Sequence, residues 1–117
     1  MLGMLACLLT IATNVTAEPW KKHIVVPPVK SMINSVVAND FDGDGHVDIL
    51  SSYDGRVVLL KGPRWIPYVV HVFDESHSRN KPRTSCIHSC LLDVDVDGDF
   101  DFCGSNNTVF WLETPNN

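Results

Sequence analysis

Short runs of apolar residues recur along the chain, separated by polar turns. The runs lie at 20–26, 33–38, 47–50, 57–60, 68–73, 86–92, 100–103 and 109–112. No stretch sustains the 3.6-residue periodicity of an amphipathic helix. Apolar runs of this length, bounded by Gly, Pro, Asn and Asp, are typical of strands. Asp54-Gly55 predicts a type I′ hairpin turn before the run at 57–60. The pattern therefore predicts an all-β protein with enough strands for two sheets.

The second half of the chain repeats the first. Residues 40–48 read D-F-D-G-D-G-H-V-D and residues 93–101 read D-V-D-V-D-G-D-F-D, so both fit D-x-D-x-D-G-x-x-D. The strand at 57–60 likewise corresponds to the strand at 109–112. The second copy lacks a fourth strand, and the run at 20–26 resembles the missing one. We therefore predict two four-stranded antiparallel, propeller-like blades (a partial β-propeller), with the N-terminal strand completing the last blade.

The two Asp-rich stretches predict metal sites. Carboxylates at positions 1, 3 and 5 of a tight loop converge when glycine at position 6 lets the backbone turn sharply. Position 7 adds a carbonyl oxygen and position 9 a further carboxylate. Hard oxygen ligands suit calcium rather than zinc or copper. We expect two calcium ions, held by Asp40, Asp42, Asp44, His46 and Asp48 and by Asp93, Asp95, Asp97, Asp99 and Asp101.

An EF-hand shares the opening of this motif, but it also needs a glutamate at position 12 and two flanking helices. Position 12 is Ser51 in the first copy and Gly104 in the second, and the flanking residues predict strands. The loops are therefore not EF-hands.

The Asp loop between strands resembles the FG-GAP repeat, also called the VCBS repeat, of integrin α-subunit propellers and many secreted proteins. The resemblance covers residues 20–115, with repeats at about 29–73 and 84–115 and the N-terminal strand at 20–26. The Phe-Trp-Leu-Glu strand after the second loop is also similar to the family, whereas the first copy has Val-Leu-Leu-Lys. The resemblance implies calcium-binding loops in an extracellular propeller. The family builds propellers of about seven blades, so this chain would supply only part of one.

The net charge of −5 comes from the two Asp loops rather than from a generally acidic surface, because nine of the fourteen acidic residues lie in these loops. No basic run suggests nucleic acid; Arg79, Lys81 and Arg83 belong to a polar turn. Residues 1–17 resemble a secretory signal peptide, with an apolar core and small residues before the predicted cut after Ala17. The apolar run is too short to span a bilayer. We expect a secreted, extracellular protein that begins at Glu18.

Three cysteines remain after such cleavage: Cys86, Cys90 and Cys103. An odd number in an oxidising compartment leaves one thiol over. A Cys90–Cys103 disulfide, buried free thiols and a zinc site that adds His88 all remain open. Asn106 begins an Asn-Asn-Thr sequon and is a candidate for N-glycosylation.

No catalytic motif stands out. The chain has no Gly-x-Ser-x-Gly sequence, and the paired acids fall in the metal loops. His23 and His71, at matching places in their strands, are assigned structural roles, and the three tryptophans favour sheet packing over sugar binding. We expect a non-catalytic binding or adhesion module whose partner is an extracellular protein or glycan, or further copies of the repeat. The alternatives are an accessory fragment of an extracellular enzyme and a truncated propeller with no ligand beyond calcium.

Overall fold

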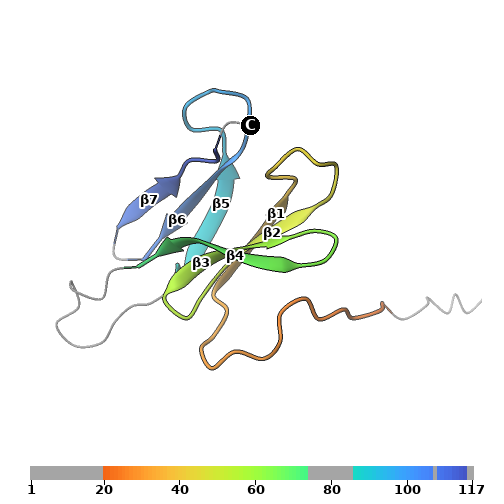
Figure 1. The fold of residues 1–117 in the computed structure, drawn as a ribbon. Coiled ribbons are helices and arrows are strands. Elements are labelled where there is room, and N and C mark those ends of the chain that lie inside the picture. The colour runs from red at the N-terminus through yellow and green to blue at the C-terminus, as the bar shows by residue number, and fades with distance from the viewer. Residues whose placement is uncertain (1–19, 74–85, 107, 116–117) are drawn as a thin grey trace, which may run out of the picture.

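The computed structural model describes residues 20–73, 86–106 and 108–115, which form two antiparallel sheets and no helix. The predicted signal peptide and the start of the second repeat lie outside these residues. The first sheet has the order β1-β2-β3-β4 and the second β5-β6-β7 (Figure 1). The strands are β1 (Ser35–Asn39), β2 (Asp48–Tyr53), β3 (Arg56–Lys61), β4 (Ile66–Val72), β5 (His88–Leu92), β6 (Asp101–Ser105) and β7 (Val109–Leu112).

The predicted all-β class and the antiparallel sheets are confirmed. Asp54 and Gly55, with φ angles of 48° and 74°, join β2 to β3. Positive φ at both central residues is the mark of a type I′ turn, whose twist matches the flanking strands. Tyr53 and Arg56 pair on either side of it. The hairpin predicted from the Asp-Gly pair is therefore present.

The two sheets stack front to back. Val37, Leu50 and Leu59 form one row across the first sheet, and the matching row of the second sheet is Cys90, Cys103 and Trp111. We call the faces that carry these rows the front faces. Phe102 and Leu112 project from the opposite, back face of the second sheet. The front face of the first sheet packs against that back face, since both belong to one apolar cluster.

The core between the sheets is small and tightly closed at its centre. Val57, Cys86 and Phe102 are each no more than 1% exposed. Ser52 on β2 also accepts a hydrogen bond from the Cys86 backbone amide at 2.8 Å, which ties the two sheets together. Burial of these apolar side chains at about 25 cal/mol per Å² is the main force that holds the sheets in contact.

The predicted N-terminal strand is wrong. Residues 20–26 form no strand, and the second sheet has three strands among the described residues. Instead, Val25, Val26 and Val29 pack on the back face of the first sheet, against Val58 and Leu60. Pro27 and Pro28 lack amide hydrogens and so disfavour a continuous ladder here. These three valines are held by side-chain packing rather than by the ladder hydrogen bonds of a strand, whereas Ile24 stays 71% exposed.

Candidate metal sites

Each Asp-rich stretch forms the loop between the first two strands of its sheet. The first loop (40–48) joins β1 to β2, and the second loop (93–101) joins β5 to β6. Both loops lie at the same end of the molecule, at the top of the view in Figure 1. Gly45 and Gly98, at position 6, have φ angles of 85° and 102°, which strongly favour glycine. The glycine requirement predicted for the sharp turn is therefore met in both loops.

Three carboxylates converge in each loop. Asp40, Asp42 and Asp48 offer oxygen atoms that all lie within 4.8 Å of one another, and Asp93, Asp95 and Asp101 do the same. These are positions 1, 3 and 9 of the motif. The structure thus brings together six of the eight aspartates predicted as side-chain ligands.

The position-9 aspartates are more than candidate ligands, because each anchors the backbone. Asp48 is fully buried; its Oδ2 accepts a hydrogen bond from the Phe41 amide at 3.1 Å and its Oδ1 one from the Gly62 amide at 2.8 Å. This carboxylate therefore fastens the start of the first loop to the end of β3. Sequence reasoning assigned Asp48 a ligand role and missed this structural one.

Asp101 repeats the arrangement in the second loop. It is also fully buried and accepts hydrogen bonds from the Val94 amide at 3.0 Å and the Thr114 amide at 2.9 Å. In both loops, Oδ2 of the position-9 aspartate accepts from the amide of the second loop residue, and Oδ1 accepts from an amide just after the third strand of the sheet. The two loops are therefore local structural equivalents, as the repeated sequence predicts.

The position-5 aspartates lie outside the two triads. Asp44 Oδ1 accepts a hydrogen bond from the His46 amide at 2.9 Å, and Asp97 Oδ1 accepts one from the Asp99 amide at 3.1 Å. Both carboxylates thus brace the turn that follows them. They remain exposed and adjacent to the triads.

The electrostatics of the two loops differ. In the first loop, the Lys61 ammonium pairs with Asp42 Oδ2, and this hydrogen bond lowers the pKa of Asp42. In the second loop, burial and the neighbouring carboxylates, Asp97 first among them, raise the pKa of Asp95. Among the residues that the structure describes, no basic side chain relieves the repulsion in the second loop as Lys61 does in the first.

Position 7 also distinguishes the loops. His46 occupies it in the first loop, but Asp99 occupies it in the second and adds a fifth carboxylate. Burial and the charges of Asp97 and Asp101 raise the pKa of Asp99. Its Oδ1 is buried and has no hydrogen-bond partner in the structure described. A buried carboxylate oxygen without a donor fits a loop that receives a cation. From the motif alone, only the carbonyl oxygen at this position is expected to bind the metal.

The cysteines do not form the zinc site that was one of the open alternatives. Cys86 lies between the sheets, where its thiol donates to the His88 carbonyl. Cys90 and Cys103 are opposite one another on β5 and β6 and line a shallow surface depression away from that core. All three are free thiols. Burial, followed by the influence of Cys90, raises the pKa of the Cys103 thiol.

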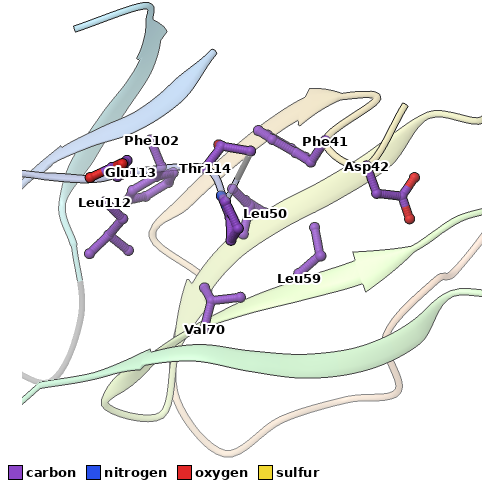
Figure 2. A pocket seen from close by; sticks show the side chains of 10 residues that line it. Phe41, Asp42, Leu50, Leu59, Val70, Phe102, Leu112, Glu113 and Thr114 are labelled. Atoms are coloured by element: carbon purple, nitrogen blue, oxygen red, sulfur yellow. The ribbon is translucent and has the colours of Figure 1, made fainter. Parts of the chain in front are cut away.

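A cavity of about 410 Å³ lies between the sheets, beside the first loop. Figure 2 shows Phe41, Leu50, Leu59 and Phe102 directed into it from both sheets. Asp42 and Glu113 are the ionisable residues among those that line it. The cavity is a gap in apolar packing rather than a cluster of catalytic groups.

The two histidines assigned structural roles differ in their surroundings. The His71 ring lies 4.9 Å from that of Phe73 and 6.0 Å from that of Phe110, centroid to centroid, so it helps to join the sheets. His23 is exposed and belongs to the N-terminal segment that is not a strand.

Comparison with known proteins gives no relative: no family model, curated protein or solved structure matches this chain. The likeness to FG-GAP repeats therefore rests on the loop motif and the strands around it. Across the described ranges, no helix is long and apolar enough to cross a membrane.

Proposed function

We propose that the protein is a secreted, non-catalytic binding module in which calcium structures the two Asp loops. The observation that carries this proposal is the convergence of three carboxylates in each loop, with ligand oxygens within 4.8 Å of one another. Carboxylates held so close repel one another unless a cation neutralises them. All the ligand atoms are hard oxygens, which favours calcium over zinc.

Calcium would act here as a structural cross-link. Each ion would join positions 1 and 3 at the start of a loop to position 9, the first residue of the following strand. Asp48 and Asp101 already hold that strand to the loop through backbone hydrogen bonds. A bound ion would therefore rigidify a loop whose ends are fixed, while the sheets carry the rest of the fold.

The front face of the second sheet is the surface that we propose contacts a partner. Leu92, Val109 and Trp111 are 55%, 83% and 40% exposed there, whereas the matching face of the first sheet is covered. Exposed apolar side chains gathered on one face mark a protein contact. Because Val25, Val26 and Val29 already pack on part of the back face of the first sheet, head-to-tail stacking of copies would have to displace them. We therefore propose that a second copy docks front face to front face, in a closed dimer. We also propose that each sheet is a propeller-like blade.

Thermal unfolding of residues 18–117 in calcium and in chelator tests the metal proposal. At a calcium concentration 100 times the dissociation constant, each site adds about 2.7 kcal/mol to the free energy of unfolding. For a domain of this size, that is a rise in Tm of roughly 10–20 °C per site. Asp40→Asn should remove one increment and Asp93→Asn the other. A Tm that is the same in calcium and in chelator would refute the proposal.

A further inference from the structure

One basic side chain reaches into the first loop. Lys61, the last residue of β3, pairs with Asp42, a member of the carboxylate triad. The two side chains are 39% and 24% exposed, so the pair is partly shielded from water. An ammonium group on a ligand oxygen competes with a metal ion for that oxygen and repels a divalent cation nearby.

The second loop carries the opposite charge at the equivalent position. Continuing the β2–β3 register one residue beyond the Ile49–Leu60 pair places Lys61 across from Asp48. Continuing the β6–β7 register one residue beyond the Phe102–Leu112 pair places Glu113 across from Asp101. The hydrogen bonds support this equivalence: the amides that bind Asp48 and Asp101 belong to the residues directly after Lys61 and Glu113, namely Gly62 and Thr114. The same place beside the position-9 aspartate is therefore basic in one loop and acidic in the other.

We propose that Lys61 is a tethered competitor of the metal ion, and that the first loop consequently binds a divalent cation more weakly than the second. This inference rests on the calcium sites proposed above and assigns them an order of filling. At low calcium, the second loop takes up an ion while Lys61 neutralises part of the first. At higher calcium, the ion displaces the ammonium group, which moves into solvent.

The choice of residue at position 7 acts in the same direction. Asp99 adds a negative charge to the second loop, and the first loop has His46 there. The first loop with Lys61 thus carries two negative charges fewer than the second loop does on its own, before Glu113 is considered. Long-range attraction for a divalent ion follows this difference.

Isothermal titration with calcium chloride, at low ionic strength, tests the proposal on single-site backgrounds. In Asp93→Asn, where only the first loop is intact, Lys61→Met should tighten calcium binding about tenfold, because it removes the charge and keeps the chain length. Lys61→Arg retains the charge and is the matched control; it should leave the affinity unchanged. In Asp40→Asn, where only the second loop is intact, Glu113→Lys should weaken binding about tenfold.

Each outcome bears on a different claim. If calcium binds to the first loop equally tightly with Lys61, Met or Arg at position 61, the competitor role is wrong and the calcium sites stand. If neither background binds calcium, with the far-ultraviolet circular dichroism of a folded β protein, the proposed function fails and the competitor role fails with it. If the gain from Lys61→Met disappears at 1 M salt, the effect is electrostatic, as proposed.

Discussion

At the scale of single residues, the two loops show how one motif position can serve two purposes. Asp48 and Asp101 accept backbone hydrogen bonds through both carboxylate oxygens and lie in the metal triads as well. Each oxygen has more than one lone pair, so accepting an amide hydrogen does not prevent it from binding a metal. These two residues therefore matter to the fold with or without calcium, unlike the exposed aspartates beside them.

Asp48→Ala should destabilise the protein even in chelator. The change leaves two backbone amides without an acceptor, and leaving such groups buried without partners costs about 2–4 kcal/mol in total. Asp48→Asn, which keeps one acceptor oxygen, should lose roughly half as much. Asp40→Ala is the control: in chelator it should cost less than about 1 kcal/mol, since water replaces its exposed bonds. Urea denaturation in chelator measures all three. Equal losses for Asp48→Ala and Asp40→Ala would show that position 9 has no structural role of its own.

The backbone of the second loop holds a second residue-scale feature. Val96, at position 4, has a φ angle of 66°, and its counterpart Gly43 has 69°. A β-branched residue is strained in this region, at a cost of about 1–2 kcal/mol, and glycine is not.

Val96→Gly should therefore stabilise the protein by about 0.5–1 kcal/mol, after the greater flexibility of glycine in the unfolded chain is taken into account. Gly43→Val should destabilise it by a similar amount. Val96 is 84% exposed, so lost packing does not complicate the comparison. The measurement is the Tm of both variants in chelator. No gain in Val96→Gly would mean that the loop relaxes without strain.

At the scale of elements, sequence pattern predicted the strands and the Asp-Gly hairpin, because short apolar runs and turn chemistry are local properties. It was wrong about residues 20–26, where the apolar run of Ile24, Val25 and Val26 resembles a strand. Whether such a run joins a ladder or packs on a face depends on which surface of the folded sheets is free. Sequence alone does not give that information.

The candidate sites were predictable to a similar extent. The spacing of aspartates predicted two loops and their convergent residues. It did not predict the pairing of Lys61 with Asp42, because those residues lie 19 positions apart and meet only through the hairpin geometry. Spacing also could not show that the Asp44 and Asp97 carboxylates accept hydrogen bonds from backbone amides. The motif is the same whether these side chains bind an amide or a metal ion.

The β5–β6 pair makes a prediction about redox state. Cys90 and Cys103 are directly opposite across antiparallel strands, where Cα atoms lie about 4.5–5.5 Å apart, within the range that a disulfide spans. Oxidation should therefore join these two and leave Cys86 as the free thiol, because Cys86 is buried in the core. Peptide mapping of the oxidised protein by mass spectrometry identifies the pair. A Cys86 disulfide with either partner would contradict this register.

At the scale of the whole molecule, the front-to-back stacking of two similar sheets leaves unlike outer surfaces. One outer surface is partly covered by Val25, Val26 and Val29, and the other exposes Trp111 and Val109. We expect copies to associate through the second surface, and a contact between two such faces should stop at a dimer.

The protein in calcium should have the mass of a dimer by sedimentation equilibrium, and Trp111→Glu should reduce it to a monomer by placing a charge in the contact. Tyr68→Glu is the control. Tyr68 is 50% exposed on β4 of the first sheet, outside the proposed contact, and its replacement should leave the dimer intact. If the unsubstituted protein is monomeric at all concentrations, the proposed contact surface is wrong.

The most direct test of the central claim is the amount of calcium that residues 18–117 retain after dialysis against a buffered calcium solution, measured by atomic emission. Two ions per chain are predicted, falling to one in Asp40→Asn and to one in Asp93→Asn. A folded protein that retains no calcium, or one whose calcium content is unaffected by both substitutions, would contradict the account.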